Sequence, residues 1–395
     1  MSGTSSNRPS TLPKEPGLRV AALFAGIGGI EAGLHQAGHS TSLLCEIEPA
    51  AQAVLRRHFP EVPLESDIRD LRRLPEVDLL TAGFPCQDLS QAGMTRGIGG
   101  QRSGLVDRVF QLLRDSNPRW VLLENVPFML QLDRGRAMWH LTEQLAGLGY
   151  QWAYRVVDAR SFGLPQRRQR VLVLASRTED PTRVLFADEA GDPPEPARDG
   201  RACGFYWTEG LRGLGWAVDA VPTLKGGSTI GIPSAPAVWM ANGLIGTLDL
   251  RDAERLQGFP ADWTATNDDR ARTRGARWKM IGNAVSVPVA RWIGERLQTP
   301  GTPLAEGSRR LRPGDAWPRA ATGAGEEAWA VQLSSWARHE PFQHLAEFLE
   351  YPVAPLSLRA AEGFLGRAER STLRFPDGLL DAVRAHIRSM RATAA

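Results

Sequence analysis

The chain has 395 residues, a formal net charge of +3 and ordinary proportions of apolar and charged side chains. This length predicts two or three domains with a large core. No apolar run approaches the length of a membrane span, which excludes an integral membrane protein built from helices. The first 17 residues are polar and lack the apolar segment of a signal peptide, so we expect a disordered tail there and a cytoplasmic protein.

Three cysteines are too few and too scattered for a disulfide framework or a zinc site, so we expect a reducing compartment and no metal. Cys45 lies in an apolar run and is most simply a core residue. Cys86 differs, because it follows Gly-Phe-Pro at the end of the apolar run 79–82, where ligands bind in open α/β sheets. Taken alone, Cys86 is either a nucleophile or an ordinary buried thiol.

A glycine-rich turn, Phe-Ala-Gly-Ile-Gly-Gly at residues 24–29, joins the first predicted strand to a helical pattern over 30–37. Such turns let the backbone approach a nucleotide-type cofactor, although they also occur for packing alone. The second predicted strand ends in Glu46, about twenty residues after the glycines, where a carboxylate that binds ribose hydroxyls is expected. Asp67 offers a further carboxylate near the same pocket.

Polar side chains also follow the later strands. The strand predicted at 120–123 ends in Glu124-Asn125, and Arg168 and Arg170 precede the strand predicted at 171–175 on one shared face. Alternating strands and helices over 18–176 predict a doubly wound, mostly parallel α/β sheet. The long, glycine-rich stretch 88–104 is typical either of a functional loop that closes over a site or of a disordered segment.

The composition changes after residue 176. The acidic, Pro-rich residues 178–200 predict a loop or linker. Residues 201–248 carry many glycines and several tryptophans and predict short strands and loops, in which we expect the tryptophans to be core residues. Residues 251–299 predict helices that return to the first domain. The Pro-, Gly- and Ala-rich residues 300–328 predict a linker, and residues 329–395 predict a helical C-terminal extension with apolar positions at helical spacing.

Six motifs, in this order, resemble the cytosine carbon-5 DNA methyltransferases over roughly residues 18–297. They are the glycine turn at 24–29, Gly-Phe-Pro-Cys-Gln at 83–87, Glu-Asn-Val at 124–126, Gln-x-Arg-x-Arg at 166–170, residues 251–260, and Gly-Asn-Ala-Val at 282–285. The resemblance implies a Rossmann-like catalytic domain at 18–176 and a target-recognition region at 177–250. It also implies S-adenosyl-L-methionine as methyl donor and a cytosine flipped from a specific duplex DNA sequence as acceptor.

The same resemblance implies the roles of individual residues. Cys86 would add as thiolate to carbon 6 of cytosine, Glu124 would hydrogen-bond ring nitrogen 3 and the exocyclic amine, and Arg168 and Arg170 would orient these groups. Positions matching the family's DNA contacts are Gln87, Ser90 and Arg102. The residues implied at the cofactor pocket are Phe24, Gly26, Ile27, Gly28, Gly29, Glu46, Ile47, Asp67, Ile68, Gly83, Pro85, Leu105, Asn283, Ala284 and Val285.

Further expectations follow from the resemblance. We expect a bacterial enzyme of a restriction-modification or phage-defence system. It would be nucleoid-associated through DNA and would act as a monomer on duplex DNA. Its candidate partners are a cognate restriction endonuclease or other defence proteins. Two alternatives are the same chemistry on tRNA and a catalytically silent DNA-binding module. The intact Cys86, Glu124, Arg168 and Arg170 argue against the silent module. A further hypothesis is that helices after residue 329 share in target recognition.

Overall fold

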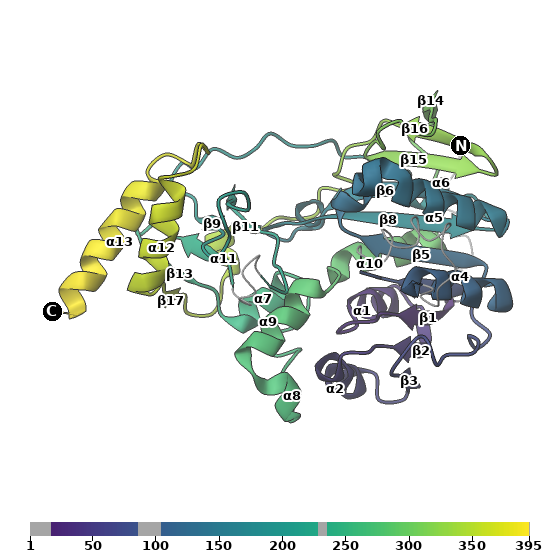
Figure 1. The fold of residues 1–395 in the computed structure, drawn as a ribbon, viewed down its shortest axis with the longest axis horizontal. Helices are drawn as coiled ribbons and strands as arrows, with labels where there is room; N and C mark the ends of the chain where they lie inside the picture. The colour runs from purple at the N-terminus through teal and green to yellow at the C-terminus, as the bar shows by residue number, and fades with distance from the viewer. Residues whose placement is uncertain (1–16, 86–103, 228–234, 395) are drawn as a thin grey trace, which may run out of the picture.

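The computed structural model describes residues 17–85, 104–227 and 235–394, which form a larger and a smaller region, each built around one sheet (Figure 1). The predicted tail at 1–17, except Gly17, and the predicted loop at 88–104, except Gly104, lie outside the described residues. No helix in the described part of the chain is both long and apolar enough to cross a membrane.

The larger region contains a ten-stranded sheet in the order β14-β16-β15-β6-β8-β5-β4-β1-β2-β3. Strands β1 to β5 are parallel to one another, and β8 runs antiparallel between β5 and β6. The doubly wound α/β fold predicted for 18–176 is therefore confirmed, although the whole sheet is mixed. The strands of this part are β1 (Arg19–Leu23), β2 (Ser40–Cys45), β3 (Leu64–Glu65), β4 (Leu79–Ala82), β5 (Trp120–Asn125), β6 (Gln151–Asp158) and β8 (Gln169–Ser176).

Helices cover both faces of this sheet, so its central strands are buried on both sides, as continuous apolar runs predict. Adjacent residues of β4 show this, because Leu79 and Leu80 belong to the apolar clusters on opposite faces. The helices on one face are α1 (Gly29–Gln36), α6 (Thr182–Leu185) and α10 (Val287–Gln298). Those on the other are α4 (Leu105–Ser116) and α5 (Arg136–Gly147), while α2 (Pro49–His58) follows β2.

The prediction of a linker at 300–328 is wrong. Strands β14 (Gly307–Arg310), β15 (Ala320–Ala324) and β16 (Glu327–Val331) extend the large sheet beyond β6. The small side chains that suggested a linker are needed for close packing, since a Cβ on Gly323 would lie 2.4 Å from the ring of Trp152. Trp317 is buried beside Trp152 and anchors the same segment.

The smaller region has a five-stranded sheet in the order β10-β9-β12-β13-β17. Its strands are β9 (Cys203–Phe205), β10 (Trp216–Val218), β12 (Ala237–Trp239), β13 (Ile245–Thr247) and β17 (Ala354–Pro355). The last strand comes from the C-terminal part of the chain and pairs with β13. The predicted target-recognition region is therefore completed by residues about a hundred positions further along.

Both faces of the smaller sheet are covered (Figure 1). Helices α12 (Leu358–Ala368) and α13 (Leu379–Ala394) share one apolar cluster with β9, β12 and β13, which confirms the predicted amphipathic helices. Helices α7 (Leu250–Arg255), α9 (Arg274–Asn283) and α11 (Leu345–Phe348) pack against the other face. Trp239 is buried and Trp207 and Trp216 are partly buried in the first cluster, as expected for core residues.

Short elements complete the fold between these parts. They are the 3₁₀ helices η2 (Pro127–Leu130), η3 (Leu132–Gly135) and η4 (Ala159–Phe162), the helix α8 (Asp269–Arg272), and the strands β7 (Gln166–Arg167) and β11 (Val221–Pro222). The last two strands pair in parallel and join the larger region to the smaller one.

Phe364→Ala tests the role of the C-terminal helices in the smaller region. Phe364 is 1% exposed, and its ring centroid lies 4.7 Å from that of Phe205 in β9. We expect the substitution to lower the free energy of unfolding by about 3–5 kcal/mol, because it leaves a cavity in a packed core. Urea unfolding measures this change. Phe342→Ala is the control, because Phe342 is 39% exposed and its substitution should lower the free energy of unfolding far less. Equal effects of the two substitutions would contradict the packing.

Candidate active site

The glycine turn between β1 and α1 has the left-handed backbone that its sequence predicts. Gly26 and Gly28 have φ of 57° and 83°. A Cβ on Gly28 would lie 2.5 Å from the ring of Phe59, so only glycine fits there. A Cβ on Gly26 would meet no atom within 4 Å, so the backbone there faces open space. The turn thus offers exposed backbone to a ligand at the N-terminal end of a helix.

Glu46 holds this turn in place from the end of β2. Its Oε2 accepts the Gly26 N–H at 2.7 Å, and its Oε1 accepts the Glu48 N–H at 2.8 Å. Burial raises the pKa of Glu46, and the backbone N–H donors oppose that effect. The neighbouring Ile47 is 57% exposed, which is unusual for isoleucine and leaves an apolar surface beside the carboxylate.

A cavity of about 760 Å³, called the first cavity below, opens at the carboxyl ends of β1, β2, β4 and β5. This volume lies within the usual range of small-molecule sites. The predicted residues that line it are Phe24, Gly26, Ile27, Glu46, Ile47, Gly83, Pro85, Glu124, Arg170 and Asn283. The cavity therefore joins the glycine turn to the polar residues at the end of β5 and the start of β8.

Seven residues implied at the cofactor pocket do not line the first cavity: Gly28, Gly29, Asp67, Ile68, Leu105, Ala284 and Val285. Asp67 forms an ion pair with Arg69, and Ile68 is buried in the core with Leu105 packed against the same cluster. The glycines and the residues after Asn283 support the wall, since a Cβ on Gly29 would lie 2.3 Å from the Val285 carbonyl oxygen.

The wall contributed by α9 contains residues that the sequence analysis missed. Ala276, Lys279 and Met280 line the first cavity, and Lys279 forms an ion pair of 3.0 Å with Glu48. These residues lie within the two helical turns that precede the Gly-Asn-Ala-Val motif. A helix ending at that motif carries them along the same side, and this spacing was the available signal.

Glu124 and Arg170 form the charged centre of the site. The Arg170 Nε lies 2.8 Å from the Glu124 Oε1, across the neighbouring strands β5 and β8. Glu124 is buried, with 8% of its surface exposed, whereas Arg170 is partly buried. Burial raises the pKa of Glu124 above the ordinary value of a carboxyl, and the Arg170 guanidinium opposes this. A carboxyl in this balance can accept a hydrogen bond or share a proton with a ring nitrogen.

Asn125 connects Glu124 to the turn that precedes Cys86. Its side-chain amide donates a hydrogen bond of 2.9 Å to the Phe84 carbonyl. A Cβ on Gly83 would lie 3.4 Å from the Glu124 Oε2, so the end of β4 and the carboxylate are in contact. Cys86, Gln87, Ser90 and Arg102 lie outside the described residues. The described chain reaches Pro85, which lines the first cavity directly before Cys86 in sequence.

Arg168 makes different contacts from Arg170. It is buried, and its guanidinium donates hydrogen bonds to three carbonyl oxygens, those of Leu224 at 2.8 Å, Gly282 at 3.2 Å and Ala284 at 2.6 Å. These carbonyls belong to the smaller region and to the end of α9. Arg168 therefore fixes the position of two walls, while Arg170 contacts the carboxylate itself.

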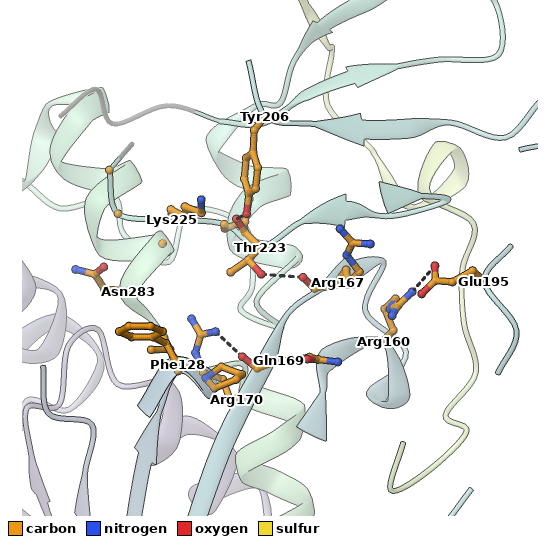
Figure 2. Close-up of a pocket in the computed structure, with 16 residues that line it drawn as sticks. Phe128, Arg160, Arg167, Gln169, Arg170, Glu195, Tyr206, Thr223, Lys225 and Asn283 are labelled. Atoms are coloured by element: carbon orange, nitrogen blue, oxygen red, sulfur yellow. Dashed lines mark hydrogen bonds and ion pairs between the residues drawn. The ribbon is translucent and has the colours of Figure 1, made fainter. Parts of the chain in front are cut away.

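A second depression of about 840 Å³, called the basic cleft below, lies between the two regions and shares Arg170, Val126 and Asn283 with the first cavity. Figure 2 shows Phe128 and Arg170 of the larger region opposite Thr223 and Lys225 of the smaller one. Its charged lining residues are Arg160, Arg167, Arg170, Lys225 and Glu195. Four of these are cations and one is an anion, but three of the cations form ion pairs, Arg160 with Asp158, Arg170 with Glu124 and Lys225 with Glu209.

Sequence comparison shows the family to which this protein belongs. Residues 18–201 and 219–299 match the family described as C-5 cytosine-specific DNA methylase. The chain belongs to this family. It is therefore a DNA (cytosine-5-)-methyltransferase, as predicted, and members of the family generally use S-adenosyl-L-methionine as methyl donor.

Relatives of the methyltransferase match most of its length. It is 52% identical over 367 residues to the type II methyltransferase M2.BsuMI of Bacillus subtilis, which covers 90% of this chain and 94% of that protein. It is 29% identical over 315 residues to the type II methyltransferase M.DsaV of Dactylococcopsis salina, with coverage of 71% and 86%. The crystal structure of the S. pombe Dnmt2 methyltransferase is similar in fold, with a TM-score of 0.52 and 18% identity over 71% of this chain and 98% of that one.

Arg168→Met tests the role of the buried guanidinium. We expect the substitution to lower the free energy of unfolding by about 3–5 kcal/mol, since three carbonyl groups that it binds would lose their donor in a dry environment. Chemical denaturation measures this, with Arg167→Met as the control, because the neighbouring side chain is only half-buried. If both variants unfold like the wild type, Arg168 does not hold these walls together.

Proposed function

We propose that this methyltransferase transfers the methyl group of S-adenosyl-L-methionine to carbon 5 of a flipped cytosine in a specific duplex DNA sequence, within a type II restriction-modification system. The observation that carries the proposal is the shared wall of the two depressions. Arg170, paired with Glu124, lines both the first cavity, which has the glycine turn, and the basic cleft. A methyl donor and a base from DNA can therefore meet at one pair of side chains.

The first cavity fits the proposed cofactor. Its glycine turn exposes backbone, Glu46 provides a carboxylate for ribose hydroxyls, and the exposed Ile47 provides an apolar surface for adenine. The bound cofactor would supply an electrophilic methyl group. Phe24, Gly26, Ile27, Glu46, Ile47, Gly83, Pro85 and Asn283 would hold it, while Gly28, Gly29, Asp67, Ile68, Leu105, Ala284 and Val285 would support these contacts from the framework.

Carbon 5 of cytosine is a poor nucleophile, so the chain's residues must first change the base. The Cys86 thiolate would form a bond to carbon 6, which pushes electron density toward carbon 5. Glu124 would share its proton with nitrogen 3 as negative charge develops on the ring, which its raised pKa favours. After methylation the proton on carbon 5 leaves to water, the Cys86–carbon 6 bond breaks, and the thiolate is regenerated.

The two arginines would take separate tasks in this scheme. Arg170 would keep Glu124 oriented toward the base, through the ion pair that the two side chains form. Arg168 would position the walls built from Leu224, Gly282 and Ala284. Gln87, Ser90 and Arg102 would contact DNA near the flipped base. We further propose that the enzyme acts as a monomer on DNA and that a cognate endonuclease or other defence proteins cleave unmodified DNA.

Methyl transfer from labelled S-adenosyl-L-methionine tests the function directly. With duplex DNA carrying many sequences, we expect transfer by the wild type and a loss of at least about 10³-fold in Cys86→Ala, because the nucleophile is gone. Cys203→Ala is the matched control, since burial raises the pKa of that thiol to about 12 and it lies in the core of the smaller region.

The other outcomes of this experiment separate the alternatives. Transfer to tRNA in place of DNA would support the alternative that the enzyme methylates cytosine in tRNA. Transfer that survives Cys86→Ala would refute the covalent mechanism. Bisulfite sequencing of DNA from an expressing host then reports the methylated site and the modified carbon together.

Glu46→Gln tests the cofactor site without catalysis. The amide nitrogen must face either the Gly26 or the Glu48 N–H, so one hydrogen bond of the turn is replaced by a repulsive contact. We expect S-adenosylhomocysteine to bind about ten- to a hundredfold more weakly in calorimetric titration. Glu65→Gln, at the exposed end of β3, should leave the affinity unchanged. Equal affinities for all three proteins would exclude Glu46 from the site.

A further inference from the structure

A third depression, of about 800 Å³, lies beside the basic cleft and is called the outer groove below. It is lined by residues 195–200, by β10 and by residues 374–377. Arg167 and Glu195 line both the basic cleft and the outer groove, so the two depressions lie next to each other. A duplex whose target base enters the cleft can therefore extend along the outer groove.

Two walls of the outer groove come from parts of the chain that do not match the family. The match covers residues 18–201 and 219–299, whereas β10 and residues 374–377 lie outside it. The fold brings these separated segments together at one surface. Members of one methyltransferase family share their chemistry and differ in the DNA sequence they modify, so determinants of specificity are expected among such unmatched segments.

The walls of the outer groove are held by packing. The ring of Phe375 lies 4.9 Å from that of Trp216 in β10 and 6.1 Å from that of the buried Phe364 in α12. On the opposite wall, the guanidinium of Arg198 lies 3.2 Å from the ring centroid of Trp239. The backbone that carries residues 374–377 is thereby tied to the core of the smaller region, and a preorganised surface loses little entropy on binding.

The charged groups of the outer groove suit base edges better than phosphates. Its lining carries Arg167, Arg198 and Arg374 together with Glu195, Asp199 and Asp377. A surface that binds only the DNA backbone is expected to be uniformly positive. Arginine donors recognise guanine in the major groove, and aspartate accepts a hydrogen bond from the cytosine amine, so side chains of both signs can take part in sequence readout.

Arg374 and Asp377 are the side chains most available for this role. Both are exposed, and neither has a hydrogen bond or ion pair with another residue in the described part of the chain. By contrast, Arg198 stacks on Trp239 and Glu195 lies 3.6 Å from Arg160. Arg374 and Asp377 can thus form contacts with DNA without breaking an existing interaction.

We propose that the outer groove is a specificity-determining DNA subsite, in which Arg374 and Asp377 contact base edges of the duplex whose cytosine is methylated. The C-terminal segment thus takes part in target recognition as well as in the folding of the smaller region. This proposal rests on the proposed function, because it takes duplex DNA as the substrate.

The test uses the full-length enzyme with a library of duplexes of random sequence. Methylated duplexes are identified by sequencing after bisulfite treatment, and bound duplexes are selected separately by affinity. For Arg374→Ala and Asp377→Asn, we expect at least about tenfold less discrimination at one or more G·C pairs of the site, as for loss of a base contact. Melting temperature and affinity for S-adenosylhomocysteine should remain those of the wild type.

Arg388→Ala is the matched control, because Arg388 is an exposed arginine of α13 outside the outer groove. It should leave the sequence preference unchanged. Wild-type preference in both groove variants would overturn the proposal. A uniform loss of affinity over all sequences, with a weaker salt dependence, would assign Arg374 to phosphate and also overturn it. A wild type that methylates no duplex would refute the proposed function, while the affinity selection would still decide the role of the groove.

Discussion

A buried cluster of polar side chains holds the two regions of this methyltransferase together. Gln166 donates to the Leu256 carbonyl at 2.8 Å and accepts the Leu224 N–H at 2.9 Å. Gln257 donates to the Ile281 carbonyl at 2.8 Å and accepts the Ser286 hydroxyl at 2.9 Å. Together with Arg168, these contacts tie the start of β8, the smaller region and the ends of α7 and α9 to one point. Because buried polar groups are costly without partners, these segments are constrained to a single relative arrangement.

The position of this cluster explains how the cleft and the first cavity share a wall. The segment at 224–227 crosses the end of α9 so closely that a Cβ on Gly282 would lie 2.0 Å from the Lys225 carbonyl carbon. Asn283 then lies between the two depressions and lines both. On the other side of this wall, the same strand β8 that begins at the cluster presents Arg170 to Glu124. Rigid attachment of the smaller region to β8 places the basic cleft beside the Glu124 carboxylate.

Much of this site follows from local sequence. The glycine turn, Glu46 and the Glu124 strand end were predictable, because each depends on a short pattern of backbone freedom, apolar residues and a polar terminus. The separate contacts of Arg168 and Arg170 were not. A spacing of two places both on one face of a strand. Which guanidinium contacts a carboxylate and which contacts carbonyl groups depends on segments more than 40 residues away. The wall from α9 likewise depends on how that helix returns to the sheet.

The sequence by itself determined the catalytic fold, the order of its motifs and the chemistry of the family, since these are carried by contiguous residues whose spacing reflects strands, turns and helices. Tertiary structure alone decided the role of residues 300–395. Alanine and glycine are as frequent in linkers as in closely packed strands, so composition could not show that β15 pairs with β6 or that Gly323 lies against Trp152. Nor could it show that β17 completes the smaller sheet through pairing with β13, because such pairing joins residues about a hundred positions apart and no local pattern records the partner.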